Sequence, residues 1–368
     1  MTREDPLGGG AANGRAPRGP AVAAAYAHCR AIARREAKNF YYAFVALPAA
    51  RRNAICAIYA FMRQADDLAD DESFSRQERR TRLDAWLADW RNACQAGDSS
   101  HPVFLAVRDA VQRFAIPLSL LDELVAGVTM DLKPASLDSA GNDETGHPVI
   151  LSEGCRGELR PEMNRAAASQ KPRAPSFRLS SGERVGNQPP DTYATFADLY
   201  RYCYLVASVV GLVCIRIFGY KDSRAEKLAE ETGIAFQLTN ILRDVAEDAA
   251  RNRVYLPLED LSAHGVSLES LLHRPADAPP TASERALLAE IAARAEKFYE
   301  SAQALMPLID RESRAALWVL VAIYHGLLSR IECADYDVFS RRATVPMPQK
   351  LGILAVGLAR MAWARLIG

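Results

Sequence analysis

Apolar residues recur at every third or fourth position along most of the chain from Ala21 onward, which is the spacing of amphipathic helices. In the range 76–94, one helical face comprises Leu83, Trp86, Leu87 and Trp90. Pro48 predicts a break followed by a new helix, and Pro117 predicts the start of a helix that runs to about 132, because proline is accepted in a first turn. Long alternating runs bounded by hairpin turns are missing, so strands are not expected. The pattern predicts an all-α protein.

Two segments lack this periodicity. Residues 1–20 are rich in Gly, Pro, Ala and Arg without the apolar core of a signal peptide, and we expect a disordered tail. Residues 135–191 are rich in Ser, Gly, Pro, Arg and Glu, with Phe177 as their only Phe, Tyr or Trp. Here we expect a disordered insertion, with a small extra lobe as the alternative. The helical parts, 21–134 and 192–368, are then predicted to form one large domain.

The last apolar stretch, 351–367, is interrupted by Arg360 and Arg365. It is too short and too charged to span a bilayer, which needs about 20 apolar residues. We interpret it as a closing core helix, and contact with a membrane surface is the alternative.

Charge and cysteine content narrow the class of protein. The chain has 368 residues with 45 Lys and Arg against 45 Asp and Glu, and zero net charge argues against a nucleic-acid partner. The seven cysteines form no C-x-x-C pair and the six histidines have no zinc-ligand spacing, which favours reduced thiols in a cytoplasmic protein. No G-x-G-x-x-G follows a predicted strand, so a Rossmann site for NADPH is not indicated, and no motif indicates a specific protein partner.

The chemistry is concentrated in two acidic stripes. The first comprises Tyr59, Arg63, Asp66 and Asp70, which follow steps of four, three and four and share one helical face. The second comprises Gln237, Asn240, Asp244 and Asp248, with steps of three, four and four. The other positions of both helices are mostly apolar, so both helices are expected to be buried with their polar stripes facing a cavity.

Like charges at this spacing repel, and burying them costs far more unless a cation neutralises them. Carboxylate oxygens suit Mg²⁺, which commonly bridges to phosphate. Two facing stripes are therefore predicted to hold Mg²⁺ ions that clamp a diphosphate. Guanidinium contacts to its oxygens would come from Arg63, Arg243, Arg251 and Arg253. The alternative is a non-catalytic helical binding protein whose stripes are solvated faces or ion-pair networks.

The surroundings suit an apolar diphosphate. Aromatic residues are supplied by 38–44, by Tyr202 and by Tyr324, and an apolar chain could lie along Val206, Val210 and Cys214. Aromatic faces stabilise a nearby cation. Together with the acidic stripes, these residues indicate a reaction that ionises the diphosphate and forms a carbocation.

Several motifs resemble the squalene/phytoene synthase family. They are the segments 39–44 (NFYYAF), 57–61 (AIYAF), 63–70 (RQADDLAD), 202–211 (YCYLVASVVG), 237–248 (QLTNILRDVAED), 253–257 (RVYLP) and 324–341. The resemblance covers roughly 22–134 and 192–345. It implies an isoprenoid (terpenoid) synthase fold, a single helical bundle with a central cavity, that joins two prenyl diphosphates head to head with Mg²⁺.

Carried over to this chain, the resemblance assigns roles to the motif residues. It implies Mg²⁺–diphosphate ligands at Asp66, Asp70, Asp244 and Asp248. It implies diphosphate contacts from Arg63, Gln237, Asn240 and Arg341, beside the Arg243 and Arg253 already named. It implies a reaction cavity lined by Phe40, Tyr59, Tyr202 and Tyr324. Ala37 and Asn39 depart from the serines that some members place near a phosphate.

Within the family, the sequences of segments 206–211 and 39–42 resemble those of bacterial presqualene diphosphate synthases. This implies two farnesyl diphosphates as substrates and presqualene diphosphate as product, without a step that needs NADPH. Joining of two geranylgeranyl diphosphates to phytoene is the alternative. A cytoplasmic enzyme is expected, with peripheral contact at the inner membrane surface left open.

Overall fold

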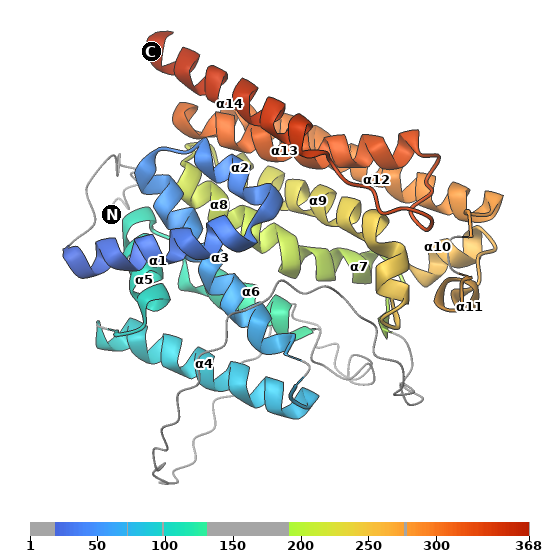
Figure 1. Ribbon diagram of the computed structural model, residues 1–368, viewed down its shortest axis with the longest axis horizontal. Coiled ribbons are helices and arrows are strands. Elements are labelled where there is room, and N and C mark those ends of the chain that lie inside the picture. Colours follow the sequence, from blue (N-terminus) through green and yellow to red (C-terminus); the bar gives the residue numbers. More distant parts are fainter. Residues whose placement is uncertain (1–18, 72, 98, 131–190, 276–277, 368) are drawn as a thin grey trace, which may run out of the picture. The chain divides into compact units, whose positions relative to one another are not determined.

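The computed structural model describes residues 19–367 except 72, 98, 131–190 and 276–277 (Figure 1). The predicted tail and insertion therefore lie almost entirely outside the described residues. Before the gap, the helices are α1 (Pro20–Glu36), α2 (Lys38–Val45), α3 (Ala49–Ala69), α4 (Arg76–Ala96), α5 (Pro102–Phe114) and α6 (Leu118–Met130). After it follow β1 (Asp191–Thr192), α7 (Phe196–Cys203), the π-helical segment η1 (Tyr204–Ser208), α8 (Val209–Phe218), α9 (Arg224–Ala249), β2 (Arg253–Val254), α10 (Leu258–Ala263), α11 (Leu268–Leu272), α12 (Ala282–Leu305), the 3₁₀ turn η2 (Met306–Leu308), α13 (Arg311–Cys333) and α14 (Met347–Ile367).

The predicted helix boundaries agree with local chemistry. Pro48 immediately precedes α3, and α6 begins one residue after Pro117. Ser75 caps α4 through a reciprocal pair of hydrogen bonds with Glu78, and Thr281 caps α12 in the same way with Glu284. The all-α prediction is confirmed for the described residues.

The one departure from a helical fold is a pair of very short strands. Among the described residues, β1 and β2 are the only strands, and they pair in parallel with Asp191 opposite Arg253. Two-residue strands carry no readable alternation, which is why the sequence did not predict them. The pairing ties the chain that leads into α7 to the segment that follows α9.

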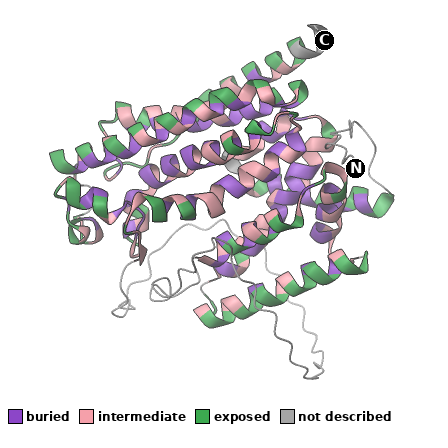
Figure 2. Ribbon diagram, turned by 180° about the vertical axis from the view of Figure 1, so that it is seen from behind, coloured by how far each residue is buried: buried purple, intermediate pink, exposed green. Residues whose placement is uncertain are grey.

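Two helices form the centre of the fold. α3 packs against α1, α5 and α8, and its buried Phe61 lies within a cluster of aromatic rings made by Trp86, Trp90 and Phe104. α9 packs along α12 and against η1, α8 and α13. Figure 2 shows buried positions concentrated on the central helices, whereas α4 is exposed along most of its length.

The approach of α9 to η1 depends on a glycine. A Cβ on Gly233 would lie 2.5 Å from the Cα of Ser208, so only glycine allows the two backbones to come this close. The Ser208 hydroxyl also donates a hydrogen bond to the carbonyl of Glu230, 2.6 Å away. These contacts fix η1 and α8 against α9.

The C-terminal helix differs from the closing core helix expected from the sequence. α14 runs beside α13 (Figure 1) and packs on α13 and α2 through one face. Leu351 and Trp363, on its other face, are 52% and 66% exposed. The apolar pattern alone did not distinguish the two faces, because α14 is apolar on nearly all sides.

Candidate active site

A cavity of about 370 Å³ lies between helices from both halves of the chain. Its wall is built from α2, α3, η1, α8, α9 and α13, with Leu305 at the end of α12. Most of the wall is apolar. The strongly polar side chains in it are Arg63, Asp66, Gln237 and Asn240. The central cavity that the resemblance implied is thus present, and it combines a polar group of side chains with an extended apolar wall.

The first acidic stripe reaches the cavity with three of its four members. Tyr59, Arg63 and Asp66 line the wall, as their spacing on one face of α3 predicts. Asp70 does not: it is exposed and caps α3, where its N–H bonds to the carbonyl of Asp66. The helical hydrogen bond keeps Asp70 on the same face as Asp66, but at the end of α3 it lies beyond the residues that line the cavity.

Arg63 is held at the cavity wall by a neighbouring carboxylate. Its Nη2 lies 2.5 Å from Oδ1 of Asp67, whose side chain is 55% exposed. The Nε of Arg63 is buried and has no hydrogen-bond partner. A buried donor without a partner is costly, so this guanidinium is suited to an added acceptor such as a phosphate oxygen.

The second stripe supplies two amides to the opposite wall. Gln237 and Asn240 lie three residues apart on α9, and Nδ2 of Asn240 donates to Oε1 of Gln237 over 3.4 Å. The Oδ1 of Asn240 is buried and accepts no hydrogen bond. It is therefore an oxygen available to a cation or to a ligand donor.

Asp244 lies beyond this wall and is held by two arginines. It accepts hydrogen bonds from Nε of Arg243 at 2.7 Å and from Nη2 of Arg342 at 2.7 Å. Burial by itself would raise the pKa of Asp244, but the hydrogen bonds and charges of Arg243 and Arg342 hold that pKa below its ordinary value. The charges of Asp244 and Arg243 also act on the hydroxyl of Tyr324, which lies in the cavity wall.

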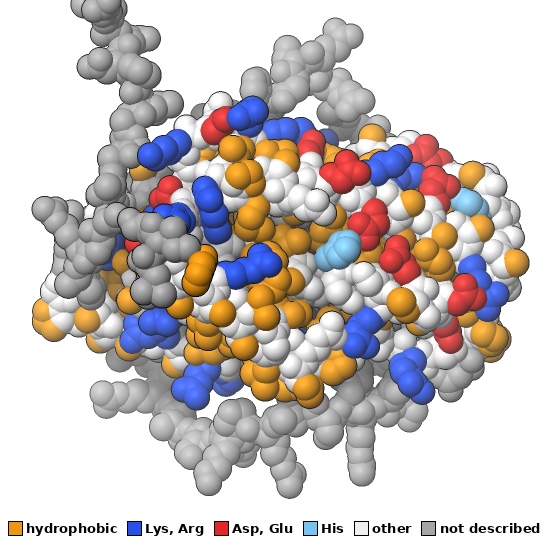
Figure 3. All heavy atoms as spheres, turned by 90° about the horizontal axis from the view of Figure 1, so that it is seen from above, with side chains coloured by type: hydrophobic (Ala, Val, Ile, Leu, Met, Phe, Trp, Pro, Cys, Tyr) orange, Lys and Arg blue, Asp and Glu red, His pale blue; other side chains and the backbone are white. Residues whose placement is uncertain are grey.

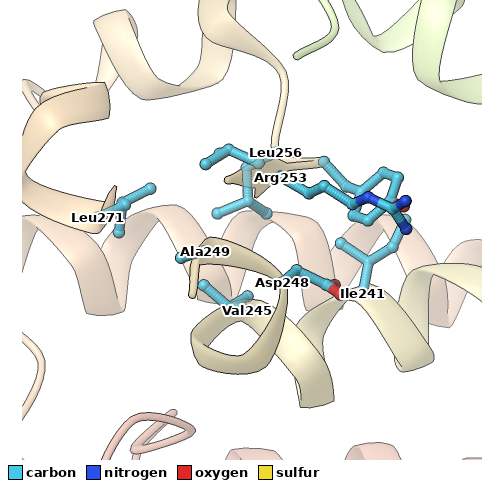
Figure 4. Close-up of a pocket in the computed structure, with 9 residues that line it drawn as sticks. Ile241, Val245, Asp248, Ala249, Arg253, Leu256 and Leu271 are labelled. Carbon is cyan, nitrogen blue, oxygen red and sulfur yellow. The ribbon is translucent and has the colours of Figure 1, made fainter. Parts of the chain in front are cut away.

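Asp248 has the opposite electrostatic setting. It lines a small hollow with Arg253, drawn in Figure 4 with Asp248 on α9 below and Arg253 on β2 above. Burial and the negative charge of Asp244 raise the pKa of Asp248 to about 6, against the opposing charges of Arg251 and Arg253. A carboxylate in such a place binds a proton or a cation more readily than an ordinary surface aspartate.

Aromatic rings surround the polar group. Phe40 and Tyr324, both predicted, line the cavity with ring centroids 5.6 Å apart. Burial raises the pKa of Tyr59 and of Tyr324 to about 12, so both hydroxyls stay neutral. Their faces can stabilise a positive charge in the cavity.

Tyr202, which was also predicted to line the reaction cavity, lies outside the cavity wall. It is buried among other aromatic residues, with its ring 5.0 Å from that of Tyr255 and 5.4 Å from that of Tyr193. Val206, Val210 and Cys214 do line the cavity. The wide π-helical turn η1 begins between Tyr202 and Val206, so simple helical spacing does not relate their faces.

Two further residues, Phe236 and Arg342, belong to the site but were not predicted from the sequence. Phe236 lines the cavity and stacks on Tyr324 with centroids 4.6 Å apart. Its position four residues before Asn240, on the same helical face, could have indicated this. Arg342 binds Asp244, whereas the predicted Arg341 is an exposed neighbour. Both lie in a loop, where no periodicity tells which of two adjacent arginines turns inward.

The donors around the cavity suit Mg²⁺ only together with a ligand. Among the described residues, no three His, Cys, Asp or Glu side chains converge to hold a metal ion. Asp66 and the unpartnered Oδ1 of Asn240 are nevertheless hard oxygen donors in the wall. Since Mg²⁺ in proteins usually completes its shell with water and substrate phosphates, this donor set fits a metal brought in with a diphosphate.

Comparison with known proteins agrees with this geometry. Residues 33–349 match the family model described as squalene/phytoene synthase. The chain is 32% identical over 335 residues to the phytoene synthase of Mycobacterium tuberculosis, covering 91% of each. It is 30% identical over 348 residues to the 15-cis-phytoene synthase of Synechococcus elongatus, covering 91% of this chain and 93% of that relative.

The fold has a solved counterpart. A dehydrosqualene synthase crystal structure matches with a TM-score of 0.68 at 24% identity, covering 93% of this chain and 98% of the other. The predicted isoprenoid synthase fold is therefore confirmed. Because the family model spans most of a chain whose helices enclose such a cavity, the chain belongs to the squalene/phytoene synthase family, whose members are prenyltransferases.

Proposed function

We propose that this protein joins two molecules of geranylgeranyl diphosphate head to head to form phytoene. The support comes first from relatives at 30–32% identity over about nine tenths of the chain that are named phytoene synthases. The likeness to a dehydrosqualene synthase, at 24% identity, bears on the fold alone. The farnesyl-based reaction expected from the sequence is thus less well supported than its alternative.

The structural observation that supports a prenyl diphosphate as the substrate class is the apolar wall beside the polar group, while the names of the relatives favour the C20 substrate. On α9 the lining runs from Ala229 to Asn240, which is roughly 16 Å of helix. Small side chains at Ala207, Gly211 and Cys214 line the facing helix. A largely apolar cavity with arginine, amide and carboxylate groups in its wall suits a linear isoprenoid diphosphate.

The residues divide the chemistry between them. Arg63, Gln237 and Asn240 are positioned to bind and orient the diphosphate. Mg²⁺, held by Asp66 with the second stripe nearby, would neutralise the diphosphate as it leaves. Tyr59, Phe236 and Tyr324 would face the allylic cation that remains, and the apolar wall would exclude water until the double bond of the second substrate attacks it. Loss of a proton, followed by departure of the second diphosphate and loss of a second proton, completes the C40 hydrocarbon.

Steady-state kinetics with purified protein and Mg²⁺ test this proposal. We expect kcat/KM for geranylgeranyl diphosphate to exceed that for farnesyl diphosphate by about tenfold or more, because the extra isoprene unit adds apolar contact in the cavity. A phytoene product that forms without NADPH would agree. Equal or better use of farnesyl diphosphate would contradict the substrate assignment, and no Mg²⁺-dependent product from either would favour a binding protein.

A further inference from the structure

The outward face of α14 is apolar over four turns. Its exposed positions recur at helical spacing and include Leu351, Ala355, Val356, Ala359, Ala362 and Trp363. The opposite face packs against the protein core through Ile353, Leu358 and Met361. Within 347–363, the exposed polar side chains are only Gln349 and Arg360.

This face concentrates the exposed apolar surface of the molecule. Six large hydrophobic residues are classed as exposed in the described part of the chain, and four of them lie on α14. Trp363 is 66% exposed and Leu351 52%. Single exposed hydrophobic residues need no explanation, but a gathering on one helix face marks an interaction surface. Figure 3 views the molecule from this side and shows hydrophobic side chains gathered across it, with Lys and Arg among them and with Asp and Glu mostly in the right half of the view.

The charged residues of α14 itself have one sign. Within 347–367 the sequence contains three basic residues, Lys350, Arg360 and Arg365, and no Asp or Glu. Arg360 lies against the ring of Trp318, 4.2 Å from its centroid, on the flank of the apolar face. An apolar helix face with basic flanks and an exposed tryptophan is complementary to a lipid surface with anionic headgroups.

A second copy of the chain fits this face less well. In a symmetric pair the same patch meets itself, which would bring the arginines of one copy toward those of the other. The segment offers no carboxylate to compensate them.

α14 also lies directly over the helices that enclose the cavity. The Tyr42 hydroxyl of α2 contacts the sulfur of Met347 at 2.7 Å, and Gly357 packs on Val319 of α13. α2 and α13 contribute Phe40 and Tyr324 to the cavity wall. A surface bound by α14 is therefore one helix layer away from a site built for an apolar ligand.

We propose that α14 is an interfacial helix that docks the protein on a bilayer containing anionic phospholipid. Trp363, Val356 and Leu351 enter the boundary between headgroups and acyl chains, and the flanking basic residues contact phosphates. The helix lies on the membrane and does not cross it. In the part of the chain that the structure describes, two helical stretches are long and apolar enough to span a bilayer, Phe196–Phe218 and Arg311–Cys333, and both contribute to the cavity wall and the core instead.

Co-sedimentation of the full chain with vesicles tests the proposal without any substrate, so its outcome is independent of the proposed reaction. We expect binding to vesicles of phosphatidylcholine mixed with phosphatidylglycerol, weaker binding to phosphatidylcholine alone, and a loss of binding as salt is raised. The fluorescence of the wild type should shift to the blue on binding, and Trp363→Phe should remove most of that shift.

The triple variant Leu351→Ser/Val356→Ser/Trp363→Ser should partition at least about tenfold more weakly, because it removes the inserted apolar area. The matched control is Phe74→Ser/Leu118→Ser, which changes residues that are 36% and 48% exposed on other parts of the surface and should bind like the wild type. An unchanged circular dichroism spectrum and melting temperature are the controls that the triple variant remains folded.

Three results would overturn the proposal. In the first, the wild type binds neither kind of vesicle; in the second, the folded triple variant binds as tightly as the wild type. In the third, the wild type forms dimers that the triple variant loses and does not bind vesicles, which would assign the face to a second copy.

Discussion

Asp244 and Asp248 lie one helical turn apart on α9, yet their surroundings shift their pKa values in opposite directions. Arg243 and Arg342 hydrogen-bond to Asp244 and keep it ionised. Burial and the negative charge of Asp244 raise the pKa of Asp248 to about 6. At the scale of single residues, Asp248 is therefore where an added cation relieves the most unfavourable charge.

Asp248→Asn should stabilise the metal-free protein in a pH-dependent way. The pKa of Asp248 is higher in the folded state than in the unfolded state, so the unfolded state ionises first and the wild type loses stability as pH rises from about 4 to about 6. At about pH 7.5 we expect the variant to be more stable by about 1–2 kcal/mol, allowing for solvent screening.

Denaturant unfolding in the presence of a chelator measures this difference. The gain should shrink at about pH 4.5, where Asp248 is protonated in the folded wild type. A gain of the same size at both pH values, or no gain at the higher one, would show that the raised pKa is not the cause.

Asp66→Asn and Asp244→Asn should each lower kcat/KM by about 100-fold or more, since each removes a charge on which diphosphate binding depends. Both side chains keep their volume, so the circular dichroism spectrum should not change. Asp84→Asn is the matched control, because Asp84 is an exposed carboxylate on α4 paired with Arg80. Near-normal rates in both site variants would refute the assignment of the two stripes.

At the scale of elements, the contact between η1 and α9 shapes the cavity. η1 contributes Val206 and Ala207 to the wall, and Gly233 contributes from α9. A side chain at Gly233 would meet the backbone of Ser208. The π-helical turn and this glycine together determine how far the two walls stand apart.

Gly233→Ala should therefore destabilise the protein by about 2 kcal/mol or more, because backbone atoms have to move. The melting temperature should fall by about 4 °C or more. Gly352→Ala on α14 is the control: its Cβ would meet nothing within 4 Å, and alanine favours a helix. Similar melting temperatures for the two variants would contradict the close contact seen between α9 and η1.

The elements were predictable wherever a long apolar period runs uninterrupted. α3, α4, α6 and α9 were read from their patterns, and seven predicted residues of the site line the cavity. Predicted residues lie outside the cavity wall, or site residues were not predicted, mainly near helix ends, turns and loops, and the predicted roles stay predictions. Asp70 falls at a helix end, Tyr202 precedes a π-helical turn, and Arg342 lies in a loop. Two-residue strands and the bare face of α14 depend on tertiary packing, which sequence spacing does not encode.

At the scale of the whole molecule, equal numbers of acidic and basic residues hide an uneven distribution. Carboxylates gather on the two stripes of α3 and α9, while the last 31 residues, 338–368, carry only positive charge. The first arrangement suits a metal-bound diphosphate in the cavity, and the second suits an anionic surface outside it. The two halves of the chain supply one stripe each, so the site exists only once the fold has brought α3 and α9 to the same cavity.

The central claim is that this cavity joins two C20 diphosphates, and the product formed from a mixture tests it most directly. Purified protein would be given equal amounts of geranylgeranyl and farnesyl diphosphate with Mg²⁺ and without NADPH, and the products identified by mass spectrometry. We predict a C40 hydrocarbon with the mass of phytoene as the main product. A C30 presqualene diphosphate as the main product, or no product that depends on Mg²⁺, would contradict the claim.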